Sequence, residues 1–365
     1  MGKYKICVYA ICKNEAQFVD RWMDSMSEAD RVVVLDTGST DDSVYRLQKR
    51  GAFVTQLTIV PWRFDYARNA SLALVPTDMD ICVCVDLDEV FLPGWRALLE
   101  AAWQPDTVQA SYRYVWNFRP DGTEGVVFWT EKIHKNGVFH WVNPVHEVLS
   151  YTGNTEYKMV EIPGMQLEHH ADPTKSRAQY LPLLELAVQE DPHNDRNMHY
   201  LGREYMFHGN WNAAIATLLR HLAMPEAVWT DERCASMRFL ARCFRELGNR
   251  ETAKQWLHRA VAEAPHLREP FTEMAQLLYE EENWEGVLYF TGEAIQITER
   301  PHTYICEAEA WGALPYDLRS LALFYTGQYV EARNTVEKAL QYASQDLRLQ
   351  ENYRLMAQAV ERQEP

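Results

Sequence analysis

Apolar runs alternate with helical patterns along the first hundred residues of the chain. β-rich runs predict four strands, at 5–11, 31–36, 52–59 and 81–85. Amphipathic patterns predict helices between them, at 18–26, 44–48 and 64–74. Strands that alternate with helices of this length indicate a mostly parallel, right-handed doubly wound sheet, which is an α/β fold. The run at 81–85 contains only apolar residues and thiols, so it predicts a strand buried on both faces.

The pattern changes twice further along the chain. Segments 109–118 and 126–130, joined by a Pro-Asp-Gly turn at 120–122, predict an aromatic-rich hairpin. From Ser176 the strand patterns stop, and four loosely similar helix pairs follow with turns near 209, 248, 282 and 327. We therefore predict an α/β domain over 1–175 and an all-α helical-repeat domain over 176–365.

The net charge limits the classes of function to consider, and the cysteine content indicates the compartment. The formal net charge of −16 disfavours a general nucleic-acid binder, because phosphate contacts need a basic surface. The seven cysteines lie scattered in apolar runs and predict reduced core thiols, which favours the cytoplasm. No long apolar segment follows the first residues, so we expect neither secretion nor a membrane span.

Two carboxylates come directly after the buried strand, Asp86 and Asp88. In an extended segment, side chains at i and i+2 point the same way, so both are expected to face one point at the carboxyl end of the strand. Such oxygen ligands suit Mg²⁺ or Mn²⁺ holding a diphosphate, and this edge is where open α/β sheets bind ligands. The alternative is a surface turn with two solvated acids. The glycine-rich dinucleotide loop is missing, which disfavours a nicotinamide or flavin enzyme.

Four ordered motifs resemble those of family 2 GT-A glycosyltransferases, whose fold is Rossmann-like. They are Ala-Ile-Cys-Lys-Asn-Glu at 10–15, Val-Leu-Asp-Thr-Gly-Ser-Thr-Asp-Asp-Ser at 34–43, Ala-Arg-Asn at 67–69 and Val-Asp-Leu-Asp-Glu at 85–89. The chain is most similar to the subgroup that adds tetratricopeptide-like (TPR-like) helices, which includes peptide S-glycosyltransferases and lipooligosaccharide glucosyltransferase-like proteins. The resemblance covers most of the first 175 residues and implies a hexosyltransferase.

The resemblance implies roles for residues that bind the nucleotide-sugar. Ile11 and Glu15 are expected to border the nucleotide, and Asp36 to contact the base or ribose. Arg68, expected on the first turn of its helix, would face the nucleotide or diphosphate. The alternatives are a helix cap for Asp36 and a surface ion pair for Arg68.

The same resemblance implies a metal site that holds Mn²⁺ or Mg²⁺. Asp88 corresponds to the strongest metal ligand of the DxD motif, and Asp86 is expected to face the ribose or reach the ion through water. His169, favoured over His170, matches a third ligand, although a histidine there can also be structural.

The catalytic base is expected near the Trp-Val-Asn-Pro-Val-His-Glu segment at 141–147, which is similar to a signature of the subgroup. Inverting transfer needs a group that takes the acceptor proton, and Glu147 is the candidate. It could instead only orient His146 or a backbone amide. Asp121 and Glu124 are the next candidates. The hairpin aromatics could form a platform under a sugar or acceptor, or simply pack in the sheet.

The predicted function is transfer of a sugar from a nucleotide-sugar, UDP-linked by preference, to a hydroxyl or thiol, with a peptide or protein as one acceptor class. The repeat groove could bind the acceptor, form a homodimer, or only buttress the catalytic domain. Other acceptors are a glycan or lipopolysaccharide, or modified phage DNA, which the charge disfavours. The remaining alternative is an inactive GT-A domain that serves as a base for a repeat scaffold.

Overall fold

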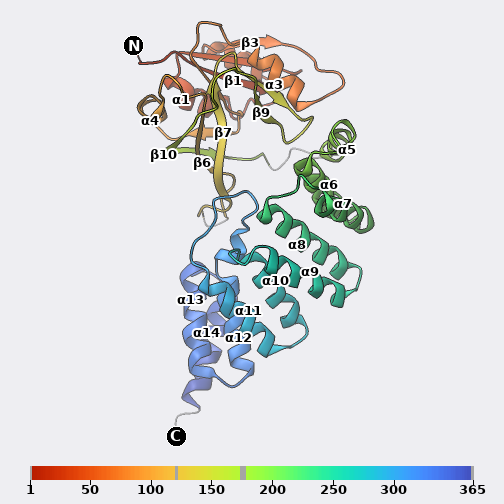
Figure 1. Ribbon diagram of the computed structural model, residues 1–365. Helices are drawn as coiled ribbons and strands as arrows, with labels where there is room; N and C mark the ends of the chain where they lie inside the picture. Colours follow the sequence, from red (N-terminus) through yellow and green to blue (C-terminus); the bar gives the residue numbers. More distant parts are fainter. Residues whose placement is uncertain (1, 120–121, 173–177, 363–365) are drawn as a thin grey trace. The chain divides into compact units, whose positions relative to one another are not determined.

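The computed structural model describes residues 2–119, 122–172 and 178–362. Its contacts divide the chain into two compact units, Met1–Ala187 and Val188–Pro365. The first contains the β-sheets and the second is helical (Figure 1).

Among the described residues, ten strands are found in the first unit: β1 (Ile6–Cys12), β2 (Arg31–Asp36), β3 (Phe53–Gln56), β4 (Ile81–Cys84), β5 (Glu89–Phe91), β6 (Gln109–Val115), β7 (Val127–Lys135), β8 (Phe139–Val142), β9 (Val148–Tyr151) and β10 (Met159–His169). The helices of this part are α1 (Val19–Ser25), the 3₁₀ helix η1 (Met26–Glu28), α2 (Ser43–Lys49), α3 (Phe64–Leu72) and α4 (Trp95–Ala102). Helix α5 (Tyr180–Glu190) spans the boundary between the units.

The main sheet has the described strands in the order β3-β2-β1-β4-β7-β6-β10-β5. Strands β3, β2, β1 and β4 are parallel, as the alternating pattern predicts. Strand β7 runs antiparallel to both β4 and β6, and β5 runs antiparallel to β10. The sheet is therefore mixed but mostly parallel and Rossmann-like. The strand order reverses between β1 and β4, which is the switch point where such sheets open a crevice for ligands.

Side chains pack against both faces of the sheet, and alternate side chains of β1 point to opposite faces. Ile6 and Val8 pack in a core that includes Trp22 of α1 and Trp95 of α4. On the other face, a second set of side chains packs together, from β1, β2, β4, β8 and the end of α3: Cys7, Tyr9, Val33, Cys82, Cys84, Trp141 and Leu72. All four residues of β4 are fully buried, which confirms the prediction for this strand.

The sequence pattern did not indicate several elements of this unit. Strand β5, helix α4 and the small β8–β9 sheet were not predicted, and β3 is shorter than the 52–59 run. The hairpin of β6 and β7 is confirmed, but β7 continues to Lys135 and so reaches the edge of β4. Part of the predicted turn, 120–121, lies outside the described residues.

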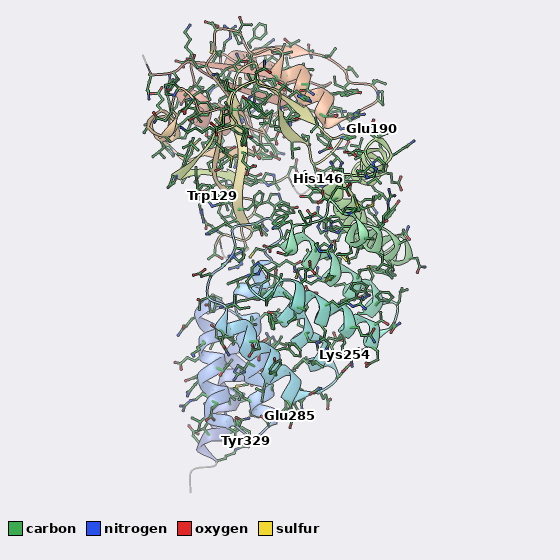
Figure 2. All side chains as sticks on the ribbon, viewed as in Figure 1. Trp129, His146, Glu190, Lys254, Glu285 and Tyr329 are labelled. Carbon is green, nitrogen blue, oxygen red and sulfur yellow. The ribbon has the colours of Figure 1, made fainter. Side chains whose placement is uncertain are left out.

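The described part of the second unit consists of helices α6 (Asp195–Phe207), α7 (Trp211–Ala223), α8 (Thr230–Glu246), α9 (Arg250–Glu263), α10 (Glu269–Glu280), α11 (Trp284–Gln296), the 3₁₀ helix η2 (Ala308–Trp311), α12 (Leu314–Tyr325), α13 (Tyr329–Tyr342) and α14 (Leu347–Glu361). Figure 1 shows them following one another as antiparallel pairs. Figure 2 labels one residue on the second helix of three pairs: Lys254, Glu285 and Tyr329. The predicted TPR-like helical repeats are thus confirmed.

The turns inside the pairs explain where the second helices begin. Gly209, Gly248 and Gly327 adopt positive φ angles, which end the first helices with little steric cost. The next side chain in the first two turns, Asn210 or Asn249, accepts a hydrogen bond from the third residue of the following helix. Gly202 has a packing reason, since a Cβ there would lie 2.6 Å from the Leu218 side chain.

Two further features of the structure are the state of the cysteines and the length of the helices. All seven cysteines lie within the described residues and are free and buried, as expected. None of the described helices is long and apolar enough to cross a membrane.

Candidate functional site

The carboxyl ends of β1, β2 and β4 bring most of the predicted residues to one edge of the sheet. Asp36 is the last residue of β2 and pairs with Cys12 at the end of β1. Ile11 lies one residue earlier on β1, and Glu15 follows in the loop, where its backbone N–H donates to Ser43 Oγ at 2.7 Å. The side chain of Glu15 is buried.

The carboxylate of Asp36 is fully buried at this edge. Its Oδ1 accepts hydrogen bonds from the backbone N–H groups of Gly38 (3.2 Å) and Ser39 (3.1 Å), so Asp36 shapes the loop after β2. Its Oδ2 is buried and has no hydrogen-bond partner among the described residues. A buried acceptor of this kind is costly unless a ligand or water donates to it.

Arg68 links two acidic groups from different parts of the chain. It lies in the middle of α3, later than the first turn where it was expected, and its side chain is only 5% exposed. Two of its nitrogens donate to Asp86 at 2.6 and 2.9 Å, and Nε donates to Glu147 Oε1 at 2.9 Å. Burial lowers the pKa of Arg68, but the charges of Asp86 and Glu147 raise it more, so the group stays charged. The ion pair is buried, unlike the surface alternative considered for Arg68.

The neighbouring residue, Asn69, fixes the segment that ends at Glu147. Its side-chain amide donates to the backbone carbonyl of Trp141 at 2.8 Å and accepts from the backbone N–H of Trp141 at 2.8 Å. The Phe64 N–H also donates to Pro144 O at 2.9 Å. Helix α3 therefore holds the 141–147 segment, and this explains why Arg68 can reach both Glu147 and the end of β4.

Asp86 lies in a network of charged groups. Besides Arg68, its Oδ2 lies 3.4 Å from Lys132 Nζ on β7, and Lys132 Nζ also contacts Glu89 Oε1 at 3.1 Å. Glu89 is buried and accepts from Tyr114 Oη at 2.7 Å and from the Asp86 N–H at 2.8 Å. Burial raises the pKa of Asp86, but Arg68 and Lys132 together lower it by a larger amount. The pKa of this carboxyl is therefore held well below its usual value.

Asp88 faces a different neighbour, His169 at the end of β10. His169 Nε2 lies 3.5 Å from Asp88 Oδ2, and Nδ1 lies 2.9 Å from the carbonyl oxygen of Trp116. A carbonyl can only accept, so Nδ1 carries the hydrogen and Nε2 is the nitrogen directed at Asp88. Burial is the largest single effect and lowers the pKa of His169, but the hydrogen bond and charge of Asp88, the charge of Glu89 and the Trp116 carbonyl together raise it by more, so the net shift is upward. His170 instead contacts Glu168 at 3.4 Å.

The two aspartates do not lie on one extended segment, contrary to the expectation. Strand β4 ends at Cys84, and a turn closed by the hydrogen bond from the Glu89 N–H to the Asp86 carbonyl (2.9 Å) separates them. Asp86 is engaged by Arg68 and Lys132, while Asp88 is beside His169. Asp88 and His169 could hold a metal ion directly, whereas Asp86, bonded to Arg68, could reach it through water or a ligand. The roles of these residues stay predictions.

Glu147 and the other candidate bases have different surroundings. The side chain of Glu147 is 12% exposed and accepts a hydrogen bond from Arg68. In the structure this contact orients the arginine. Glu124 forms an ion pair with Arg113. Asp121 lies outside the described residues.

The hairpin aromatics divide between packing and the site. Tyr112 and Tyr114 are buried in the sheet core, and Phe128 packs against it. Trp116 is 40% exposed, and its ring lies 6.2 Å from that of His169. Phe118 stacks on His170 with ring centres 5.5 Å apart. Trp116 is therefore the most exposed of the described hairpin aromatics, and it lies beside His169.

Sequence reasoning assigned no role to Lys132 or Tyr114 in the charge network and placed Glu89 only behind the aspartates. Lys132 comes near Asp86 only because β7 pairs with β4, which no local pattern shows. The one available signal was Glu89, a third acid behind the two aspartates, because a buried acid needs a cation or a hydrogen-bond donor.

No protein-family model matches this chain. Over 99 residues it is 27% identical to the lipopolysaccharide core biosynthesis glycosyltransferase LpsC of Rhizobium meliloti (strain 1021). The match spans 27% of this chain and 36% of that relative, so the chain is similar to about a third of a glycosyltransferase.

Solved structures of other proteins resemble about half of the chain. A chain of the APC/C hetero-tetramer Cut9–Hcn1 is 13% identical with a TM-score of 0.40, covering 50% of this chain and 33% of that one. MamA is 18% identical with a TM-score of 0.37, covering 46% and 89%. Yeast Tom70 is 15% identical with a TM-score of 0.39, covering 52% and 37%.

Proposed function

We propose that this chain is a metal-dependent, inverting glycosyltransferase that moves a sugar from a nucleotide-sugar, a UDP-sugar by preference, to a hydroxyl or thiol. One observation carries the proposal. The end of β2 and the turn after β4, on either side of the switch point, contribute Asp36, Asp86 and Asp88, with Arg68 held beside them. Partial similarity to a glycosyltransferase supports the same reaction class.

The nucleoside part of the donor would contact Asp36. Its buried Oδ2 has no partner among the described residues and suits a donor group of a base or ribose. Ile11 and Glu15, at the end of β1, would border the nucleotide. This position matches the general rule that open α/β sheets bind nucleotides at the switch point.

The diphosphate would lie nearer Asp88. The donor set of Asp88 and His169 fits Mn²⁺ or Mg²⁺, with Mn²⁺ favoured by the imidazole. When bound, the ion would act as a Lewis acid that offsets charge on the leaving diphosphate. Arg68 and Lys132 both have raised pKa values, because the ion pairs outweigh burial, and they supply fixed positive charge close to this position.

The acceptor proton must be taken by a nearby base as the acceptor attacks the anomeric carbon. Glu147 is retained as the candidate. Its hydrogen bond to Arg68 supports the competing role, in which Glu147 positions the arginine and another group or water takes the proton.

The helical unit supports an acceptor-binding role. A cavity of about 360 Å³ lies among α8, α9, α10 and the segment before α12, and is lined by charged groups that include Arg238, Arg242, Glu273 and Glu307. Helical repeats commonly present such concave surfaces to peptides. We therefore favour a peptide or protein acceptor, and a homodimer through the same surface is the alternative use of the repeats.

A glycan acceptor is the second candidate, and one observation favours it. The relative LpsC is named as a lipopolysaccharide core biosynthesis enzyme. Modified DNA is disfavoured by the net charge of −16, and an inactive scaffold by the intact set of acids and Arg68.

A thermal-shift screen tests the proposal. The chain is mixed with Mn²⁺ and each of a panel of UDP-, GDP-, dTDP- and CMP-sugars, and the melting temperature is compared with that of Asp88→Ala. A ligand bound only by the native state raises the melting temperature. We expect at least one UDP-sugar to stabilise the parent in a metal-dependent way and not the variant. If no nucleotide-sugar stabilises the parent, the scaffold alternative is favoured.

A further inference from the structure

A second cluster of metal-ligating side chains lies in the helical unit, far along the sequence from the site above. It consists of Asp195 in the first turn of α6, His221 near the end of α7 and Glu232 in the first turn of α8. One ligand atom from each lies within 4.8 Å of the other two. His221 is fully buried and Glu232 is 3% exposed, so this is not a solvated acidic surface.

The imidazole of His221 has one nitrogen bonded and the other directed into the cluster. Nδ1 lies 2.9 Å from Ser236 Oγ. Nε2 is buried without a hydrogen-bond partner among the described residues and lies 3.4 Å from Glu232 Oε1. A buried nitrogen left in this way costs free energy unless something binds it. A histidine bonded through one nitrogen, with the other directed at a carboxylate, has the arrangement of a metal ligand.

Glu232 is held in a matching way. Its Oε2 accepts a hydrogen bond from Tyr304 Oη at 2.5 Å, which leaves Oε1 as the oxygen that faces His221. Outer hydrogen bonds of this type orient ligating carboxylates. Both Glu232 and His221 are thus fixed from outside the cluster, by Tyr304 and by Ser236.

The spacing fits a tetrahedral ion. Ligands at about 2.0–2.1 Å from a tetrahedral Zn²⁺ lie roughly 3.3–3.4 Å from one another. The His221–Glu232 separation of 3.4 Å already has this value. Asp195 is half-buried at a helix start, where its side chain can move to close the third position.

We propose that Asp195, His221 and Glu232 bind a transition-metal ion of the Zn²⁺ class, with water in a fourth position. Imidazole with two carboxylates favours Zn²⁺ over Mg²⁺ or Ca²⁺, which take oxygen ligands. The charge of Glu232 acts on Arg196, so this arginine offsets part of the negative charge of the two carboxylates. The ion joins three successive helices and stabilises this end of the repeat array.

Zinc binding to the full chain tests the proposal, in a background that removes the predicted metal ligand of the first unit. In Asp88→Ala, equilibrium dialysis against Zn²⁺ with metal analysis is expected to give one tightly bound ion per chain. Adding Asp195→Asn or His221→Gln is expected to weaken that binding at least tenfold. Co²⁺ in place of Zn²⁺ should give the visible absorption of a tetrahedral site, lost in the same variants.

The control is His208→Gln, also in the Asp88→Ala background. His208 Nε2 lies 3.4 Å from Glu204 Oε1, the same separation as in the cluster, but the pair does not belong to the three-residue group. We expect this variant to bind Zn²⁺ as its parent does. Asp195 is half-buried and asparagine has the same side-chain shape, so Asp195→Asn is expected to fold. This variant tests the proposal even if His221→Gln does not fold. Absence of Zn²⁺ binding in the Asp88→Ala background, or equal binding in Asp195→Asn, overturns the proposal.

Discussion

At the level of single residues, Arg68 links the turn after β4 with the 141–147 segment. It holds Asp86 with two hydrogen bonds and Glu147 with a third, and it is almost completely buried. Removing one partner of a buried ion pair leaves an uncompensated charge, which is costly. Glu147 therefore has a structural reason to be present whether or not it takes a proton.

Two substitutions of Glu147 separate these roles. Glutamine can still accept a hydrogen bond from Arg68 Nε but is no base, whereas alanine removes both functions. If Glu147 positions Arg68, Glu147→Gln should keep transfer activity within about tenfold and Glu147→Ala should lose about 10- to 100-fold, since a hydrogen bond to a charged group contributes roughly 1.5–3 kcal/mol.

Steady-state transfer rates with the donor found in the screen provide the measurement. A general base contributes about 10²–10⁴-fold, so a loss of that size in Glu147→Gln would assign the base role to Glu147 and contradict the positioning role.

His134 makes a separate prediction about pH. It is fully buried, with Nε2 2.9 Å from Tyr9 Oη and Nδ1 3.1 Å from the Lys135 carbonyl oxygen. Burial lowers the pKa of His134 from 6.5 to about 4. The unfolded chain therefore binds a proton between pH 6.5 and 4 that the folded chain does not, and stability falls as pH falls through this range. The contribution lost by pH 4 is about 3 kcal/mol.

Urea unfolding of the parent and His134→Gln at pH 7.5, 6, 5 and 4 measures this effect. Glutamine can accept from Tyr9 Oη but does not titrate, so the variant should lose less stability on acidification. Equal losses in both proteins would show that His134 titrates alike in the folded and unfolded states.

The turns inside the helix pairs carry a prediction at the element scale. Three of them have glycine at positive φ, but the third pair has Glu282 there, with φ of +54°. An L-residue in this conformation costs roughly 1–2 kcal/mol. Glycine avoids this cost, but it loses more conformational entropy on folding, so the net gain is smaller. We expect Glu282→Gly to raise the free energy of unfolding by about 1 kcal/mol.

The matched control is Glu282→Ala, which removes the same side chain but keeps the positive-φ cost. Chemical denaturation should show a stability close to that of the parent for the alanine variant. A stability gain of the same size in both variants would mean that the glutamate side chain, and not the backbone, is unfavourable.

Much of the fold was readable from local patterns, because β1, β2 and β4 are continuous apolar runs and the helix pairs have helical periodicity. The pairing of β7 with β4 and the whole of β5 were not, since the partners β4 and β10 lie far away from them in the sequence. Contacts between segments far apart in the sequence also explain which part of the site could not be predicted. Asp36 ends β2 and Asp86 comes shortly after β4, so their edge was predictable, whereas the approach of Lys132 depends on the β4–β7 pairing.

The turn at the end of β4 shows how a local rule can fail. The i and i+2 argument required extended backbone, but the hydrogen bond from the Glu89 N–H to the Asp86 carbonyl closes a turn. That turn gives the two aspartates different neighbours, Arg68 and His169. Neither contact has a short-range signal, because α3 and β10 come from separate parts of the chain.

At the scale of the whole molecule, the chain joins a sheet with a charged edge to a stack of helix pairs. The chemistry proposed for each unit depends on a separate metal: Mn²⁺ or Mg²⁺ near Asp88, and Zn²⁺ near His221. These sites are separable by experiment, since Asp88→Ala and Asp195→Asn change different units. Loss of the zinc site should lower the stability of the helical unit without changing nucleotide affinity.

The central claim is that the sheet edge binds a nucleoside diphosphate through a metal held by Asp88. Calorimetric titration of UDP into the parent and into Asp88→Ala, each with Mn²⁺ and with EDTA, tests it most directly. We predict binding to the parent with Mn²⁺, and affinity at least tenfold weaker with EDTA or in Asp88→Ala. No UDP binding to the parent, or equal affinity in all four titrations, would contradict the account.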